Sequence, residues 1–215
     1  MKNKKDFTIM LKEAGIMFAI TLIAGIMLGF VYELTKEPIA YQAELKIQRT
    51  CAAVFREAAA FKEVELIEAV PNNNGFSNGQ EPVNQAVLGK VYQAISSEGV
   101  LLGYVINVTS GEGYGGDIEL MMGVTMEGKL NGISFLNISE TPGLGMQAEE
   151  ILAPQFAGKT EDTFTYTKTG AIAENQIDAI SGATVTTKAV TDAVNKGLYY
   201  FNTVLKEGGI QNEGK

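Results

Sequence analysis

The chain has 215 residues and a formal net charge of −8, and its length suggests one or two domains. Hydrophobic residues make up 46% of the sequence and charged residues 20%, which argues against both a disordered chain and a protein with many membrane spans. The acidic balance argues against a nucleic-acid partner, because binding phosphates needs a basic surface. With no histidine and one cysteine, Cys51, the chain cannot hold a histidine-ligated metal, an iron–sulfur cluster or an internal disulfide. Any redox chemistry must therefore come from an organic cofactor.

Residues 14–32 form an uncharged, apolar stretch near the N-terminus. At about 1.5 Å per residue, a helix of this length nearly matches the roughly 30 Å hydrocarbon core of a membrane. The stretch ends in Phe30, Val31 and Tyr32 and lacks the small residues of a cleavage site, which favours a retained anchor over a cleaved signal peptide.

The charges and small residues around this span predict its orientation and packing. Lysines at positions 2, 4, 5 and 12 precede it, so the positive-inside rule predicts a cytoplasmic N-terminus and a domain on the extracytoplasmic side of the cell membrane. Thr21, Gly25 and Gly29 are four residues apart, a spacing that favours close packing against helices of partner subunits.

The rest of the chain has a helical composition first and a β-rich one afterwards. Residues 33–70 have a helical composition that includes Ala58–Ala60, and Pro38 marks a helix start or a kink. A loop follows from Pro71 to Pro82. Strand composition covers residues 87–95, 100–108, 118–126 and 130–137, and Glu127-Gly128 predicts a hairpin turn between the last two.

Two or three short elements are expected between residues 149 and 170, and a final helix from about Thr184 to Gly208-Gly209. The buried face of that helix should carry Val190, Val194, Gly197, Leu198, Phe201 and Leu205. We therefore expect an α+β fold with a mainly antiparallel sheet. The expected organisation is a cytoplasmic N-terminus (1–13), a transmembrane helix (14–32), a helical connector (33–70) and a cofactor domain (71–215).

Three stretches could carry chemistry. Residues 111–116 match G-x-G-x-x-G, but the composition predicts a strand after them where a dinucleotide fold needs a helix, so we interpret them as a glycine-rich loop between strands. Residues 140–145 contain Pro142-Gly143, which predicts a type II turn that presents backbone N–H groups and the Thr141 hydroxyl.

The third stretch, residues 178–184, ends where the final helix begins. Ser181 is a good N-cap residue, and the free N–H groups of the helix suit a phosphate. Thr184 offers a hydroxyl beside those groups, and Asp178 could accept a hydrogen bond. An ordinary capped helix is the alternative interpretation of this spacing.

Taken together, the three stretches resemble a known family. Residues 178–184 are similar to the D-x-x-[ST]-G-A-T flavinylation motif of FMN-binding subunits in bacterial ion-pumping redox complexes. Residues 140–145 and 113–116 are similar to the T-P-G-L-G and G-Y-G-G segments of the same family. Their order, their spacing and the N-terminal anchor also fit, and the length is similar to that of the G subunit of the Rnf complex.

The resemblance implies that a flavin transferase attaches FMN through a phosphoester to Thr184. It implies further that Thr141 and Leu144 lie against the ring and that Ser181, Gly182 and Ala183 surround the phosphate. Gly143 is also expected among the cofactor-binding residues. We add Lys188, one helical turn on, as a group that could offset phosphate charge, and Asp178 as a hydrogen-bond acceptor. No metal site and no catalytic residue of the chain's own is expected.

The function that the resemblance implies is electron transfer between ferredoxin and NAD through partner subunits of a membrane-bound ion translocase. Three alternatives remain open at this point: a C-type subunit of a sodium-translocating NADH:quinone reductase, a stand-alone extracytoplasmic flavin reductase, and a non-redox anchored assembly module. The sequence does not identify the pumped ion, the flavin potential, the immediate electron donor and acceptor, or the role of Cys51.

Overall fold

The structure, a computed structural model, describes residues 2–64 and 86–206. The chain divides into two compact units, Met1–Lys46 and Ile47–Lys215. The expected loop over residues 71–82 and the helix end at Gly208-Gly209 lie outside the described residues.

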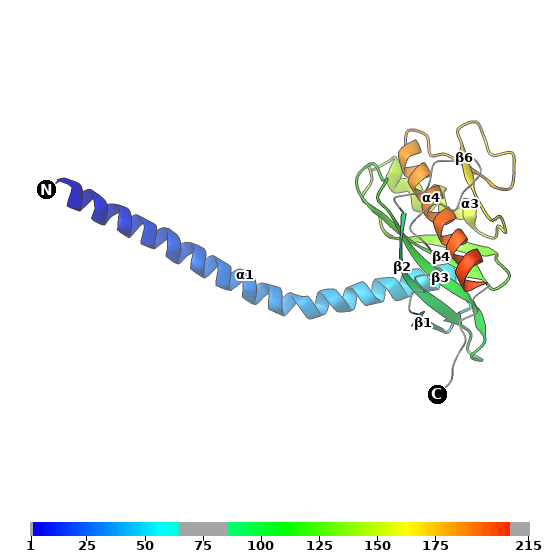
Figure 1. Cartoon of the computed structure of the whole chain (residues 1–215), viewed down its shortest axis with the longest axis horizontal. Coiled ribbons are helices and arrows are strands. Elements are labelled where there is room, and N and C mark those ends of the chain that lie inside the picture. The colour runs from blue at the N-terminus through cyan, green and yellow to red at the C-terminus, as the bar shows by residue number, and fades with distance from the viewer. Residues whose placement is uncertain (1, 65–85, 207–215) are drawn as a thin grey trace. The chain divides into compact units, whose positions relative to one another are not determined.

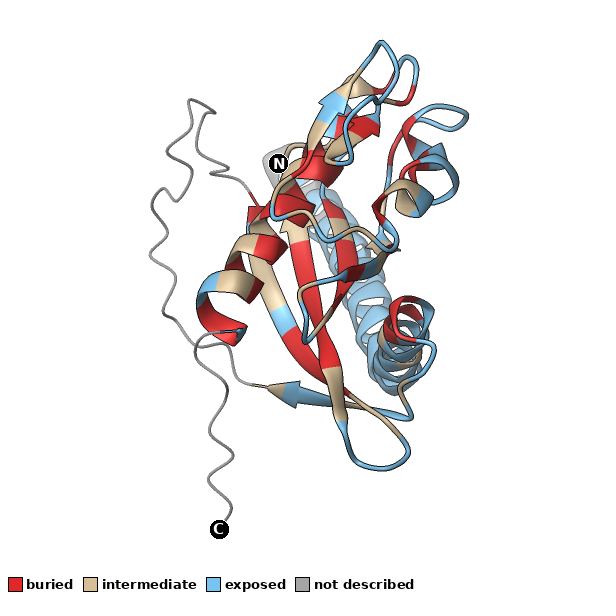
Figure 2. Cartoon of the chain, turned by 90° about the vertical axis from the view of Figure 1, so that its right-hand side faces the viewer, coloured by how far each residue is buried: buried red, intermediate tan, exposed pale blue. Residues whose placement is uncertain are grey.

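The first unit consists of helix α1, which runs from Lys2 to Val54 and continues into the second unit. Its apolar side chains between Ile9 and Tyr41 are exposed (Figure 2), and the helix is long and apolar enough to cross a membrane. The Thr21 hydroxyl donates hydrogen bonds to the Met17 and Phe18 carbonyls at 3.1 and 3.0 Å, so the helix satisfies this polar group internally, as a lipid environment requires. Pro38 lies inside α1 and does not start a helix.

The second unit is built on a five-stranded antiparallel sheet in the order β1-β2-β3-β4-β5 (Figure 1). The strands are β1 (Ala60–Val64), β2 (Ala86–Ile95), β3 (Leu101–Ser110), β4 (Ile118–Thr125) and β5 (Leu130–Asn137). The four strands expected from composition are confirmed. The hairpin between β4 and β5 is also confirmed, with Gly128 at φ +88°.

The prediction of helix over Ala58–Ala60 is wrong. Helix α1 ends at Val54, and Ala60 begins β1, where it pairs with Ile95 of β2. Alanine favours helix only weakly, and the ladder of backbone hydrogen bonds along β2 outweighs that preference.

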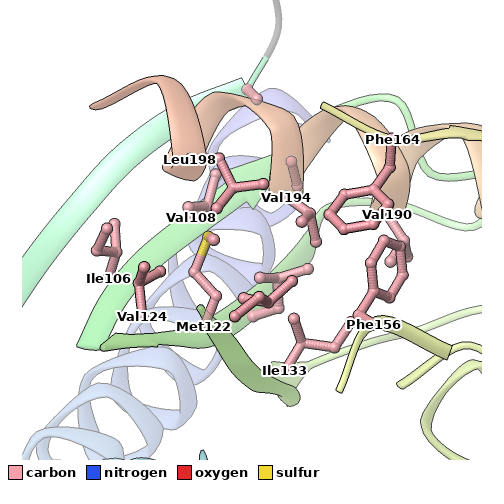
Figure 3. Close-up of a cluster of buried hydrophobic side chains, with 14 of the residues drawn as sticks. Ile106, Val108, Met122, Val124, Ile133, Phe156, Phe164, Val190, Val194 and Leu198 are labelled. Carbon is pink, nitrogen blue, oxygen red and sulfur yellow. The ribbon is translucent and has the colours of Figure 1, made fainter. Parts of the chain in front are cut away.

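Helix α4 (Thr184–Tyr200) covers one face of the sheet, and its contacts are with β2, β3 and β4. Val190, Val194 and Leu198 point from it into the core beside Met122 of β4 (Figure 3). A Cβ at Gly197 would lie 2.0 Å from Met122 Sδ, so the helix approaches the sheet closely there. The expected start of the helix and its buried face are both confirmed.

The remaining elements are short. They are η1 (Gly145–Gln147), α2 (Ala148–Ile151), α3 (Ala153–Phe156), β6 (Thr165–Thr167), β7 (Gln176–Asp178) and η2 (Phe201–Leu205). Strands β6 and β7 pair in parallel. The buried amide of Asn195 on α4 accepts from the Phe164 N–H at 2.7 Å and donates to its carbonyl at 2.8 Å, so it fixes the chain just before β6 to the helix.

The opposite face of the sheet is covered by the C-terminal end of α1. Cys51, Val54 and Phe55 are buried there against strand residues that include Val105 and Met121. A Cβ at Gly123 would lie 2.9 Å from the Phe55 ring, so this glycine leaves the space that the ring fills. The side-chain amide of Asn131 donates to the Val54 carbonyl and satisfies one of the free acceptors at the helix end.

Burial raises the pKa of the Cys51 thiol to about 11, so the thiol stays protonated in the folded protein at neutral pH. In the purified, detergent-solubilised chain at pH 8, a maleimide or disulfide reagent should label Cys51 slowly, and it should label one thiol at once after denaturation. The variant Phe55→Ala, which opens the cluster, should be labelled faster than the parent. Rapid labelling of the native parent would contradict this packing.

The pKa of Cys51 is higher in the folded protein than in the unfolded chain. The contribution of this thiol to the free energy of unfolding should therefore be present below pH 9 and lost as the pH rises toward 11.

Candidate functional site

A cavity of about 460 Å³ lies where the three stretches identified in the sequence meet. Its size is within the range of small-molecule and cofactor sites. The residues that line it come from the β3–β4 loop, from the segment after β5, and from the start of α4: Tyr114, Glu140, Thr141, Leu144, Gly145, Gly182, Ala183, Thr184, Val185 and Thr186. Segments that are far apart in the sequence thus form one site.

The turn at Thr141–Leu144 forms one side of the cavity. The Leu144 N–H donates to the Thr141 carbonyl at 3.1 Å, and Gly143 has φ +75°, as the third position of a type II turn requires. The turn presents the Leu144 side chain, 38% exposed, toward the start of α4: a Cβ at Gly182 would lie 3.2 Å from Leu144 Cδ2. The expected turn is confirmed, and it lies beside the third stretch.

The start of α4 forms the other side. The N-cap position is Ala183, and no side chain caps the helix, so the expectation that Ser181 is the N-cap is wrong. The Thr187 hydroxyl instead accepts from the Ile180 N–H at 3.1 Å, and this bond shapes the turn that leads into the helix. The first-turn N–H groups have no acceptor within the helix, and they lie beside the half-buried Thr184. Such a terminus favours an anion.

The buried carboxylate of Glu140 connects all three stretches. Its Oε1 accepts from the Gly115 N–H at 3.1 Å, and its Oε2 accepts from the Thr186 hydroxyl at 2.7 Å. Gly145 packs against both Thr186 and Glu140, since a Cβ there would lie 2.6 Å from Thr186 Oγ1 and 2.7 Å from Glu140 Cβ. We call Gly115, Glu140, Gly145 and Thr186 the Glu140 cluster. It fixes the positions of the glycine-rich loop, the turn and the helix start relative to one another.

The glycine-rich loop lies between two strands, β3 and β4, and no helix opens at it. This agrees with the rejection of a dinucleotide-binding motif. Gly115 packs closely, since a Cβ there would lie 2.1 Å from the Ser139 carbonyl oxygen. The loop places Tyr114, 75% exposed, at the edge of the cavity.

Sequence comparison identifies the family. Residues 113–199 match the family described as FMN-binding domain, and residues 1–54 match the RnfG N-terminal region. The G subunit of the proton-translocating ferredoxin:NAD(+) oxidoreductase complex of Clostridium ljungdahlii is 32% identical, over 89% of this chain and 95% of that protein. The chain belongs to the family of Rnf complex G subunits.

Two further similar proteins come from related complexes. The G subunit of the Na(+)-translocating ferredoxin:NAD(+) oxidoreductase complex of Acetobacterium woodii is 29% identical, over 95% of this chain and 98% of that protein. The solved structure of the C subunit of the Na(+)-translocating NADH-quinone reductase of Parabacteroides distasonis is 23% identical with a TM-score of 0.47, covering 72% of this chain and 80% of that chain. As an Rnf G subunit, the chain is an electron-transfer flavoprotein subunit of a multi-subunit oxidoreductase complex in a membrane.

The cavity of this Rnf G subunit has the features that FMN needs. Leu144, Val185 and Tyr114 present exposed apolar surface that a flat ring could cover. The uncapped start of α4 and the Thr184 hydroxyl supply donors for a phosphate. Gly145, Glu140 and Thr186 pack closely together and all line the cavity. FMN therefore fits the residues present.

The structure brings together five of the nine residues proposed from the sequence of this Rnf G subunit: Thr141, Leu144, Gly182, Ala183 and Thr184. Gly143 and Ser181 are exposed neighbours of the lining residues and do not line the cavity themselves. Sequence reasoning did not single out Tyr114, Glu140, Gly145, Val185 and Thr186. All five lie within or beside the quoted motifs, but nothing in their spacing says which side chains turn inward.

Asp178 lies outside the cavity and organises the preceding loop. Its Oδ1 accepts from the Ala171 N–H at 2.6 Å. Its backbone N–H donates to Gln155 Oε1 at 2.7 Å, and its carbonyl accepts from Gln155 Nε2 at 3.1 Å. The hydrogen bond that the Asp178 side chain is expected to accept therefore comes from the protein's own backbone.

Lys188 also lies outside the cavity lining. Its Nζ contacts Glu112 Oε2 at 2.6 Å and Asp192 Oδ2 at 2.7 Å. Burial by itself would lower the pKa of Lys188, but the hydrogen bonds and charges of Asp192 and Glu112 outweigh it and raise that pKa. The Lys188 charge is thus already paired, and its pairing with Glu112 joins the glycine-rich loop to α4 from outside.

Replacing Gly145 with alanine should disturb the site, because the new Cβ would press on Thr186 and Glu140. We expect a loss of about 1–3 kcal/mol in the free energy of unfolding, as for other overpacked sites, and a lower FMN content. Denaturant unfolding and flavin absorbance of the purified chain measure both. The adjacent, partly exposed Met146→Ala is the matched control and should change stability by less than about 0.5 kcal/mol. Equal behaviour of the two variants would contradict the close packing at Gly145.

Proposed function

We propose that this Rnf G subunit holds FMN bonded through its phosphate to Thr184 and relays electrons between ferredoxin and NAD through partner subunits. The observation that supports this best is the cavity that Thr184, at the uncapped start of α4, lines together with Thr141 and Leu144 of the turn. The anion site at the helix end suits the phosphate, and the apolar rim suits the ring. The remaining contacts between FMN and the lining residues stay predictions.

The attachment we propose is a group transfer from FAD by a flavin transferase. Thr184 Oγ1 forms a bond to the phosphorus of the FMN half, and the bond between the two phosphates of FAD breaks. AMP leaves, and the hydroxyl proton passes to a base of the transferase. Thr184 is suited to this role because it is half-buried and directly follows the small residues Gly182 and Ala183.

The variant Thr184→Val should abolish covalent attachment, because it removes the hydroxyl and keeps the side-chain shape. The intact mass of the chain, purified from its native host or after co-expression with a flavin transferase, should show one added FMN in the parent and none in this variant. Thr184→Ser is the matched control and should keep the modification, since it keeps the hydroxyl. A parent chain without added mass, or a modified Val variant, would contradict attachment at Thr184.

FMN supplies the one- and two-electron chemistry that lets carriers of different stoichiometry exchange electrons. The chain's own side chains hold and position this group. The part of the chain that the structure describes contains no cluster of histidine, cysteine, aspartate and glutamate suited to a metal. In this proposal the substrates of the complex react at partner subunits.

We further propose that the cofactor domain lies on the extracytoplasmic side, as the N-terminal lysines predict. The apolar helix over residues 9–54 supports an anchor in the membrane. A membrane-impermeant amine reagent added to right-side-out vesicles should then label lysines of the domain, such as Lys90. Labelling of Lys90 only after the vesicles are opened would contradict this orientation.

Reducing the intact complex with ferredoxin should reduce the flavin on Thr184 before NADH accumulates. Stopped-flow absorbance resolves the two events, and a complex that contains the Thr184→Val variant serves as the control for the other flavins. NADH formation at the normal rate while the flavin on Thr184 stays oxidised would remove this chain from the electron path.

A further inference from the structure

We propose that Glu140 is a positioning residue whose buried negative charge, in the wall of the cavity, lowers the reduction potential of the flavin held there. The inference rests on the proposed function only in that FMN occupies the cavity. It adds to that function a residue that controls how strongly the cofactor attracts electrons.

Glu140 is a buried carboxylate that has no countercharge among the residues that the structure describes. Glu140 is 7% exposed, and it lines the cavity. The ion pairs among the described residues involve the carboxylates of Glu63, Glu112 and Asp192, and none involves Glu140. Burying an unpaired carboxylate costs free energy, and a protein retains such a group where its charge or its hydrogen bonds have a use.

Both hydrogen bonds of Glu140 come from neutral donors. The Gly115 N–H can only donate, and the Thr186 hydroxyl donates to the other oxygen at 2.7 Å. Both contacts match the ionised carboxylate, which only accepts hydrogen bonds. Neither donor carries a full charge, so the negative charge of Glu140 is not cancelled within the cluster.

The charge of Glu140 acts on the electrostatics of flavin reduction. Reduction by two electrons and one proton leaves a net negative charge on a flavin ring. A fixed negative charge in the wall of the same cavity opposes that change, and salt screens a buried charge only weakly. The positive charge of Lys188 compensates little for the charge of Glu140, because Lys188 is already paired with Glu112 and Asp192. Glu140 therefore favours the oxidised cofactor and makes the reduced one a stronger electron donor.

The substitution Glu140→Gln separates charge from geometry. A glutamine can accept from the Gly115 N–H through its oxygen and donate to Thr186 Oγ1, which also accepts hydrogen bonds. The cluster then keeps its shape and loses its charge. Glu140→Asp keeps the charge on a shorter side chain, and Glu98→Gln removes an exposed carboxylate in the β2–β3 turn, outside the cavity lining.

The experiment is spectroelectrochemical titration of the full-length chain, flavinylated by co-expression with a flavin transferase, for the parent and the three variants. We expect Glu140→Gln to raise the midpoint potential by the equivalent of about a ten-fold change in the reduction equilibrium, roughly 30 mV for a two-electron couple. Glu140→Asp should stay closer to the parent than Glu140→Gln does, and Glu98→Gln should match the parent. Intact mass confirms equal flavin loading.

The outcomes separate this proposal from the proposed function. A loaded Glu140→Gln chain with the parent's potential overturns the role of Glu140 and leaves the FMN site intact. Loss of FMN from the Gln variant alone also overturns it, because the charge would then be a requirement for loading. An equal rise in the Asp variant would assign the effect to geometry and would count against the charge. A parent chain that carries no FMN overturns the proposed function and this inference together.

Discussion

The site depends on one buried interaction, the pair of hydrogen bonds that the Glu140 carboxylate accepts from the Gly115 N–H and the Thr186 hydroxyl. Each bond joins segments that are far apart in the sequence, and both end on the buried Glu140 carboxylate, so a lost partner would leave a buried polar group unsatisfied. Position 145 has to be a glycine because the Glu140 carboxylate and the Thr186 hydroxyl occupy the space that a side chain there would need. These contacts fix the segments that enclose the cavity.

Helix α4 carries both the site and the core. Thr184 and Thr186 in its first turn face the cavity, while Val190, Val194 and Leu198 further along are buried against the sheet (Figure 3). Close approach at Gly197 and the paired bonds of Asn195 to Phe164 fix the helix in place. The position of Thr184 is therefore set by packing well away from it.

The second face of the sheet brings the end of α1 into the core of the second unit. The last turns of α1 bury Cys51, Val54 and Phe55 against the sheet, and the chain then forms β1 along β2. The alanines near residue 59 favour helix by a few tenths of a kcal/mol each, a preference that is small compared with a ladder of backbone hydrogen bonds. Strand pairing with β2 therefore outweighs the local preference of the alanines for helix.

The sequence by itself determined the apolar anchor segment, the antiparallel strands, the Pro142-Gly143 turn and the start of α4 at Thr184, because each follows from local hydropathy, periodicity or turn chemistry. It also carried the family, since the three motifs are contiguous runs of residues. Only the tertiary structure decided that these runs form one cavity, that Glu140 joins them, and that Lys188 and Asp178 are engaged with protein groups outside it. The physical reason is that side-chain direction and pairing depend on segments distant in the chain, which no local pattern records.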